Sequence, residues 1–250
     1  MKVIVVLLVL VVGAVIAATS TGRVNVAEMG RAARENPFPK KSAMHAPFED
    51  LLAKLKAHPQ LSQEIANAGR GRQAMAVGDK LLSRGLARLD DRSLVLLIKL
   101  SGDILDAMDE RACGMVLKGN VGAGATQAAL YRAATGKPLP LLQFADALDK
   151  VGVEKGSAYL ELVYQALAKA VDRSIAEREP HASEVQAAFA NLLGSRFTPE
   201  QRSAIFGTLS RAERAGNEEL CLAARALYAN IGVTPEPHRR VILRYVAADN

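Results

Sequence analysis

Apolar residues recur at three- and four-residue steps along most of the chain. The clearest run reaches from Tyr159 to Ile175, with charged residues mainly on the opposite side. A second run, from Arg92 to Met108, is the most apolar stretch of the interior. Because this period gathers apolar side chains on one face of a helix, both runs predict amphipathic helices with a buried side.

Capping signals and apolar spacing extend this prediction to most of the chain. Thr198-Pro199-Glu200-Gln201 is typical of a capping box, Asp90 or Asp91 can cap the helix over 92–108, and Ser183 can cap a helix over 185–193. Further helices are predicted over 48–55, 61–68, 81–89, 126–134 and 141–151, and after Thr198, Gly216 and Thr234. Strand-like alternation is missing beyond the first residues. The fold class is therefore all-α, a multi-helix bundle of about eight to ten short amphipathic helices with no sheet.

The first residues differ from the rest of the chain. An unbroken apolar stretch runs from Val3 to Ala18 after a single Lys2, and small residues follow Val15. Residues 1–18 are interpreted as a signal peptide or an N-terminal membrane anchor, 19–46 as a linker or loosely packed arm, and 47–250 as a helical domain. This predicts a periplasmic or secreted protein, or one anchored in the inner membrane. The excess of basic residues after the stretch favours a third arrangement, an anchor with a cytosolic body.

Composition and charge exclude few partners. Half of the residues are apolar, 4% are aromatic, there is no Trp, and the formal net charge is +6. The charges are mixed along nearly every segment, without a basic block interleaved with aromatic residues. Nucleic acid is therefore not expected as a partner, whereas an anionic membrane surface is compatible with the charge.

The two cysteines, Cys113 and Cys221, permit one disulfide in an exported chain. Closing a loop of about a hundred residues stabilises a fold by roughly 4 to 5 kcal/mol in the chain-entropy model. The alternative is a pair of unbonded core thiols, since both residues lie beside apolar helix positions.

The usual catalytic and metal-binding motifs are not found in the sequence. The histidines are His45, His58, His181 and His238. Their spacing does not place two of them on one helix face, so neither a metal site nor a cofactor is expected. The loop with Gly119, Gly122, Gly124 and Thr126 lacks the lysine and preceding strand of a phosphate-binding loop, and nucleophilic-serine motifs do not occur.

Carboxylates are densest at Asp103, Asp106, Asp109 and Glu110. Clustered carboxylates can share a proton and perform acid–base catalysis, as in glycosidases. Basic residues nearby in the sequence favour a solvated helix face instead, and the absence of Trp weakens the case for a sugar-binding platform. An envelope enzyme such as a cell-wall hydrolase remains an alternative function.

A basic run near the C-terminus supplies the candidate partner contacts His238, Arg239 and Arg240. Guanidinium groups can bind phosphate or an acidic partner, although exposed residues in the first turn of a terminal helix have the same composition. The leading hypothesis is a non-enzymatic helical protein of the bacterial cell envelope that binds another envelope protein, as inhibitors, immunity proteins and accessory proteins do. A carrier of lipid or a small apolar ligand is a further alternative.

Overall fold

The computed structural model describes residues 36, 38–67, 72–118, 140–172, 180–212 and 214–247, and no strand occurs in these segments. Eleven helices lie there: α3 (His45–Ala57), α4 (Pro59–Asn67), α5 (Arg72–Ala87), α6 (Asp91–Ala107), α7 (Glu110–Leu117), α9 (Pro140–Lys150), α10 (Val153–Val171), α11 (Ala182–Arg196), α12 (Pro199–Ser210), α13 (Asn217–Ile231) and α14 (His238–Ala247). The all-α prediction is confirmed, with one described helix more than the upper end of the expected range.

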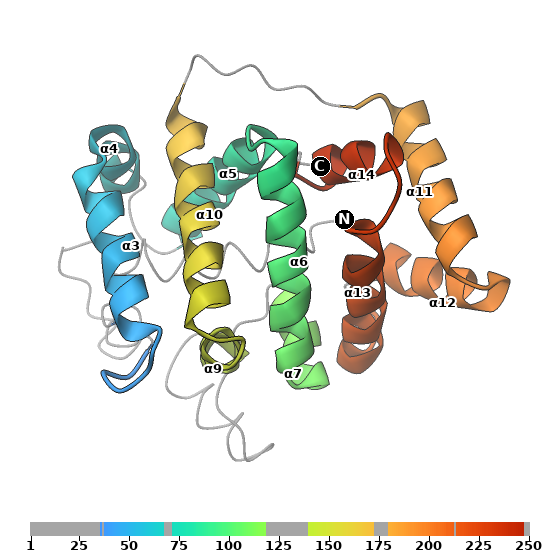
Figure 1. Cartoon of the computed structure of the whole chain (residues 1–250), viewed down its shortest axis with the longest axis horizontal. Helices are drawn as coiled ribbons and strands as arrows, with labels where there is room; N and C mark the ends of the chain where they lie inside the picture. Colours follow the sequence, from blue (N-terminus) through green and yellow to red (C-terminus); the bar gives the residue numbers. More distant parts are fainter. Residues whose placement is uncertain are drawn as a thin grey trace.

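The helices form an array whose spatial order differs from their order in the chain. Figure 1 shows α3, α10, α6 and α13 side by side, with α11 and α12 beyond α13. Helix α5 packs against α10, α7 against α13, and α14 against α11. Helix α10 therefore lies between two helices that precede it in the sequence.

The two longest apolar runs become the central helices α10 and α6. The buried face of α10 includes Tyr159, Val163 and Leu167, as the period predicts, and the helix ends at Val171 rather than at residue 175. Residues 173–179 lie outside the described segments. Burial of these apolar side chains on neighbouring helices is the main stabilising contribution of both helices.

The starts of three helices bear on the capping predictions. Asp90, not Asp91, caps α6, because its carboxylate accepts hydrogen bonds from the Ser93 backbone N–H at 2.9 Å and the Ser93 hydroxyl at 2.8 Å. Helix α11 begins at Ala182, so the prediction that Ser183 caps it is wrong. Helix α12 has the predicted capping box, in which Thr198 and Gln201 exchange hydrogen bonds.

Two glycines allow helix backbones to touch. A Cβ atom at Gly85 of α5 would lie 1.8 Å from the carbonyl oxygen of Ala166 in α10. At Gly114 of α7 it would lie 1.9 Å from the carbonyl oxygen of Asn217 in α13. These close approaches fix the pairs α5–α10 and α7–α13, since any larger residue would force the helices apart.

A disulfide joins α7 to α13. Cys113 and Cys221 are fully buried, their Cα atoms are 5.6 Å apart, and they are separated by 108 residues in the sequence. The bond therefore closes a loop that contains α9, α10, α11 and α12. It lies in the same helix pair as the Gly114 contact, so a covalent link and a close backbone approach hold these helices together.

The described part of the predicted arm packs onto the core. Phe38 and Met44 are buried, the Phe38 ring lies 5.6 Å from the Phe48 ring, and α3 begins at His45. The packed body thus begins earlier than residue 47, because apolar side chains of the arm fill space beside α3 and α10. The leader at 1–18 and the helix predicted over 126–134 lie outside the described segments.

None of the described helices combines the length and the apolar character needed to span a membrane.

Candidate functional site

A groove of about 550 Å³ lies where the ends of four helices meet the side of α14. We call it the α14 groove. Its lining comprises Ala87, Arg88, Leu89, Asp90, Asp91, Lys169, Pro180, Glu184, Pro237, Arg240, Val241 and Arg244. Seven of these twelve residues carry a charge, so charged groups lie beside the apolar surface of the groove.

Asp91 lies at the centre of the charges in this groove. Arg244 donates to Asp91 Oδ1 through Nη2 at 2.6 Å and Nε at 3.1 Å, and to the Ala87 carbonyl oxygen through Nη1 at 2.9 Å. Arg240 places its Nε 2.7 Å from Asp91 Oδ2. One carboxylate thus holds two guanidinium groups, which leaves this cluster with a net positive charge.

The two arginines differ in exposure. The Arg240 side chain is 63% exposed, whereas that of Arg244 is 24% exposed. Arg244 therefore fixes α14 to the junction of α5 and α6, and its bonds to both Asp91 and a backbone carbonyl leave it little freedom. Arg240 reaches solvent with part of its guanidinium group still accessible to an incoming anion.

The other acidic residues of the groove stabilise helix N-termini. The Asp90 carboxylate caps α6, and the hydrogen bonds from the Ser93 backbone N–H and hydroxyl lower the pKa of Asp90, with a smaller contribution from the nearby Lys169 ammonium. The Glu184 carboxylate accepts a hydrogen bond from the His181 backbone N–H at 2.9 Å at the start of α11. Each of these negative charges therefore faces the positive end of a helix dipole.

Arg88 plays the complementary role at the end of α10. Its Nη1 atom donates to the carbonyl oxygens of Lys169 at 2.9 Å, Ala170 at 3.1 Å and Asp172 at 2.7 Å. A cation bound to the last carbonyls of a helix offsets the negative end of its dipole. The remaining cations of the groove are Arg240, which pairs with Asp91, and Lys169, which lies near the Asp90 carboxylate.

The three candidate partner contacts near the C-terminus have different surroundings in the structure. Arg239 binds the Glu236 carboxylate through Nη2 at 2.8 Å and Nε at 3.0 Å, one turn away on the same segment. His238 is the first residue of α14, is partly buried and does not line the groove. Among the predicted contacts, Arg240 is therefore the one that the structure brings to a groove.

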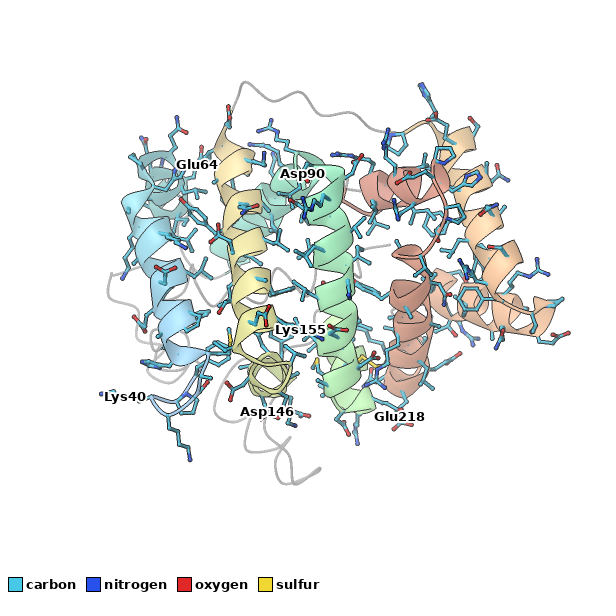
Figure 2. All side chains as sticks on the ribbon, in the orientation of Figure 1. Lys40, Glu64, Asp90, Asp146, Lys155 and Glu218 are labelled. Atoms are coloured by element: carbon cyan, nitrogen blue, oxygen red, sulfur yellow. A yellow bond between two sulfur atoms is a disulfide. The ribbon has the colours of Figure 1, made fainter. Side chains whose placement is uncertain are left out.

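The acidic cluster lies at the other end of α6 and has structural contacts. Asp103 forms an ion pair with Lys155 of α10 at 2.7 Å, and Asp109 caps α7 through the Ala112 backbone N–H at 3.3 Å. Figure 2 shows Asp90 at the start of α6 and Lys155 of α10 toward the opposite end of α6. These carboxylates are divided between separate partners.

Arg225 of α13 organises the rest of the cluster. Its Nη2 atom donates to the carbonyl oxygens of Leu105 and Met108, both at 2.8 Å, and so binds the end of α6. Asp106 and Glu110 each lie 3.5 Å from the same guanidinium group. Within the described part of the chain, no group of three or more His, Cys, Asp or Glu residues is placed to hold a metal ion.

Two other grooves have a different charge balance. In the groove of about 370 Å³ between α3 and α10, Lys54 lies between two carboxylates, and hydrogen bonds to Asp50 and then Glu161 raise the pKa of Lys54 to about 12. In the groove of about 690 Å³ between α12 and α13, Arg211 pairs with Glu219 at 3.0 Å. Neither places two guanidinium groups on one carboxylate, which distinguishes the α14 groove.

Comparison of the chain with protein-family models, curated proteins and solved structures gives no match. The case for a site therefore rests on geometry. Sequence reasoning named Arg240 but missed Arg244 and the role of Asp91. The four-residue spacing of the two arginines, which puts them on one face of a helix, was the available signal.

Proposed function

We propose that this is a non-enzymatic interaction protein of the bacterial cell envelope, which binds an acidic segment of another protein in the α14 groove. The observation that carries the proposal is the pair of guanidinium groups, Arg240 and Arg244, on the single carboxylate of Asp91. An acidic side chain that approaches Arg240 adds the missing negative charge. Arginine suits this role because its planar group binds a carboxylate through two hydrogen bonds at once.

The composition of the groove favours a protein segment as its ligand, rather than a small apolar molecule. The groove draws its lining from the ends of α5, α6, α10 and α11 and from the side of α14. Arg240 and Lys169 are its remaining cations, so a segment lying along α14 can place more than one acidic side chain against it. Complementary charges of this kind speed association and select the partner.

The envelope location is part of the proposal and rests on the apolar stretch of residues 3–18. Its test is the intact mass of the protein recovered from separate envelope and cytosolic fractions of the cells. A mass that lacks the leader supports export. A full-length mass with the protein recovered from the cytosol contradicts it.

Photo-crosslinking in cells that produce the protein tests the partner. A photoreactive amino acid at Ser183, which is exposed in the first turn of α11 beside the groove, should give a discrete protein adduct. Arg240→Glu should remove that adduct, because it places a second negative charge beside Asp91.

Arg211→Glu provides the matched control, since Arg211 is 61% exposed and also pairs with one carboxylate, but lies in the groove between α12 and α13. The adduct should persist in this variant. An adduct that survives Arg240→Glu, or that Arg211→Glu removes equally, contradicts the proposed site.

A further inference from the structure

The outer side of α13 is apolar although it faces solvent. Leu222 and Val233 are 53% and 57% exposed, the exposed Ala229 lies between them, and Ala226 is partly exposed. Gly232 keeps a helical backbone conformation after α13 ends, so Val233 continues the turn of the helix. Steps of four, three and four residues therefore put these apolar side chains on one side, which we call the α13 stripe: Leu222, Ala226, Ala229 and Val233.

Opposite charges lie at the two ends of the α13 stripe. Glu218 lies one turn before Leu222, and Figure 2 shows it at the end of α13 where the helix begins. At the other end, Arg196 of α11 donates from Nη2 to the Val233 carbonyl oxygen at 3.0 Å. Glu218 and Arg196 are both exposed, and neither forms an ion pair with another described residue. The stripe is thus bordered by an anion at one end and a cation at the other.

Two other carboxylates near the ends of the stripe already have partners. Glu219 forms an ion pair with Arg211 at 3.0 Å, and Glu236 forms one with Arg239 at 2.8 Å. A molecule that covers the stripe therefore meets an apolar centre, one available carboxylate and one available guanidinium group.

We propose that a second copy of this chain covers the α13 stripe, with the two α13 helices antiparallel about a twofold axis. The axis passes between Ala226 and Ala229, so Leu222 of each copy lies against Val233 of the other. The same arrangement brings the acidic end of each stripe to the basic end of the other, and the two contacts are equivalent by symmetry. A parallel pairing would place the two Glu218 carboxylates together and leave both arginines unpaired.

The dimensions of a helix are compatible with this pairing. At about 1.5 Å per residue, the stripe is roughly 16 Å long, and Glu218 lies about 6 Å beyond Leu222. Two long side chains can cross that distance to form an ion pair with Arg196 beside Val233. Small side chains at the centre of the stripe let the helices approach to about 8 Å. Because the contact is short, the dimer should be weak and reversible.

Sedimentation equilibrium of the purified protein tests the dimer. The weight-average mass should rise from that of one chain towards that of two as the protein concentration is raised. Leu222→Lys should weaken association by about tenfold or more, because it places a charge in the apolar contact. Val153→Lys is the control, since Val153 is 48% exposed at the start of α10 and does not belong to the stripe. It should leave association unchanged.

Charge reversal tests the pairing of the two ends. Glu218→Arg and Arg196→Glu should each weaken association, and the combined variant should associate more tightly than either, since it forms the same pair with the charges exchanged. Circular dichroism checks that each variant is folded.

The unsubstituted protein decides the proposal even if a variant fails to fold. A protein that remains monomeric up to about 1 mM overturns it and leaves the stripe to a different molecule. A dimer that Leu222→Lys leaves intact, or that Val153→Lys weakens equally, also overturns it, and so do additive losses in the combined charge variant. The dimer does not depend on the partner proposed for the α14 groove, whose lining includes no residue of α13.

Discussion

Replacing Gly85 with alanine should destabilise the protein although alanine is the better helix former. Gly85 lies in α5, and the added Cβ atom would be 1.8 Å from the Ala166 carbonyl oxygen in α10. Contacts below 3.0 Å are essentially never seen for real Cβ atoms, so the two helices must separate by about 1.2 Å. The obstacle is backbone, which cannot rotate away as a side chain can.

The size of the effect follows from two opposing contributions. Moving packed surfaces apart by about 1 Å loses up to half of the dispersion energy of the contacts involved, and overpacking of this kind costs about 3 kcal/mol. The higher helix propensity of alanine compared with glycine stabilises the folded state by about 1 kcal/mol. The net loss should be about 2 kcal/mol, or roughly 4–8 °C in melting temperature.

Thermal and urea unfolding of Gly85→Ala provide the assay, and Gly207→Ala provides the control. Gly207 lies in α12, and a Cβ atom there meets nothing within 4 Å. That variant should be stabilised by up to about 1 kcal/mol. The reasoning is refuted if Gly85→Ala is as stable as the unsubstituted protein or if both variants change in the same direction.

Two further predictions concern the disulfide and the cap of α6. Replacing Cys113 and Cys221 together with alanine should lower the free energy of unfolding by about 5 kcal/mol, since their bond closes a loop across 108 residues; an unchanged urea midpoint would contradict this. Asp90→Ala should lower it by about 1 kcal/mol at neutral pH, because the cap of α6 is lost. The folded state depresses the pKa of Asp90, so its stabilisation is present above the ordinary value of 3.8 and disappears as the pH falls through the lower folded value. Denaturation curves of the two proteins should therefore converge at strongly acidic pH, and a constant difference would show that the carboxylate charge is not responsible.

The period of apolar residues was sufficient to predict the central helices. The runs that became α6 and α10 each contain several turns, so the three- and four-residue steps are repeated often enough to identify a buried face. Helix α7 was not predicted as a separate element. It has eight residues with Gly114 among them, which gives too few turns for a period to be recognised.

The neighbours of each helix could not be predicted. An apolar face indicates that a helix is buried against another helix, but it does not identify that helix. Gly85 and Gly114 determine two of the helix pairs, but nothing in the sequence around them marks them as contact points. The same limit applies to the site. Arg240 and Arg244 share a helix face by their spacing, but their common partner Asp91 lies about 150 residues earlier in the chain, as the separation of 153 between Asp91 and Arg244 shows.

The acidic cluster shows why a dense group of carboxylates in the sequence is weak evidence for a catalytic site. Asp103 to Glu110 was the densest group of carboxylates, but its members bind Lys155, Arg225 or the start of α7. Two of these partners, Lys155 and Arg225, belong to other helices, and the sequence does not show that they lie beside the cluster. A group of like charges is therefore a candidate site only after the surrounding cations are known.

The place of α10 between α3 and α6 also sets an order of events during synthesis. Lys54 of α3 meets Glu161 of α10 across 107 residues, so α3 leaves the ribosome long before the surface that covers it. A chain stopped before Val153 exposes the apolar faces of α3 and α5 together. Such a nascent chain is a substrate for chaperones and proteases until α10 has been made, and the time spent in that state depends on the rate of translation.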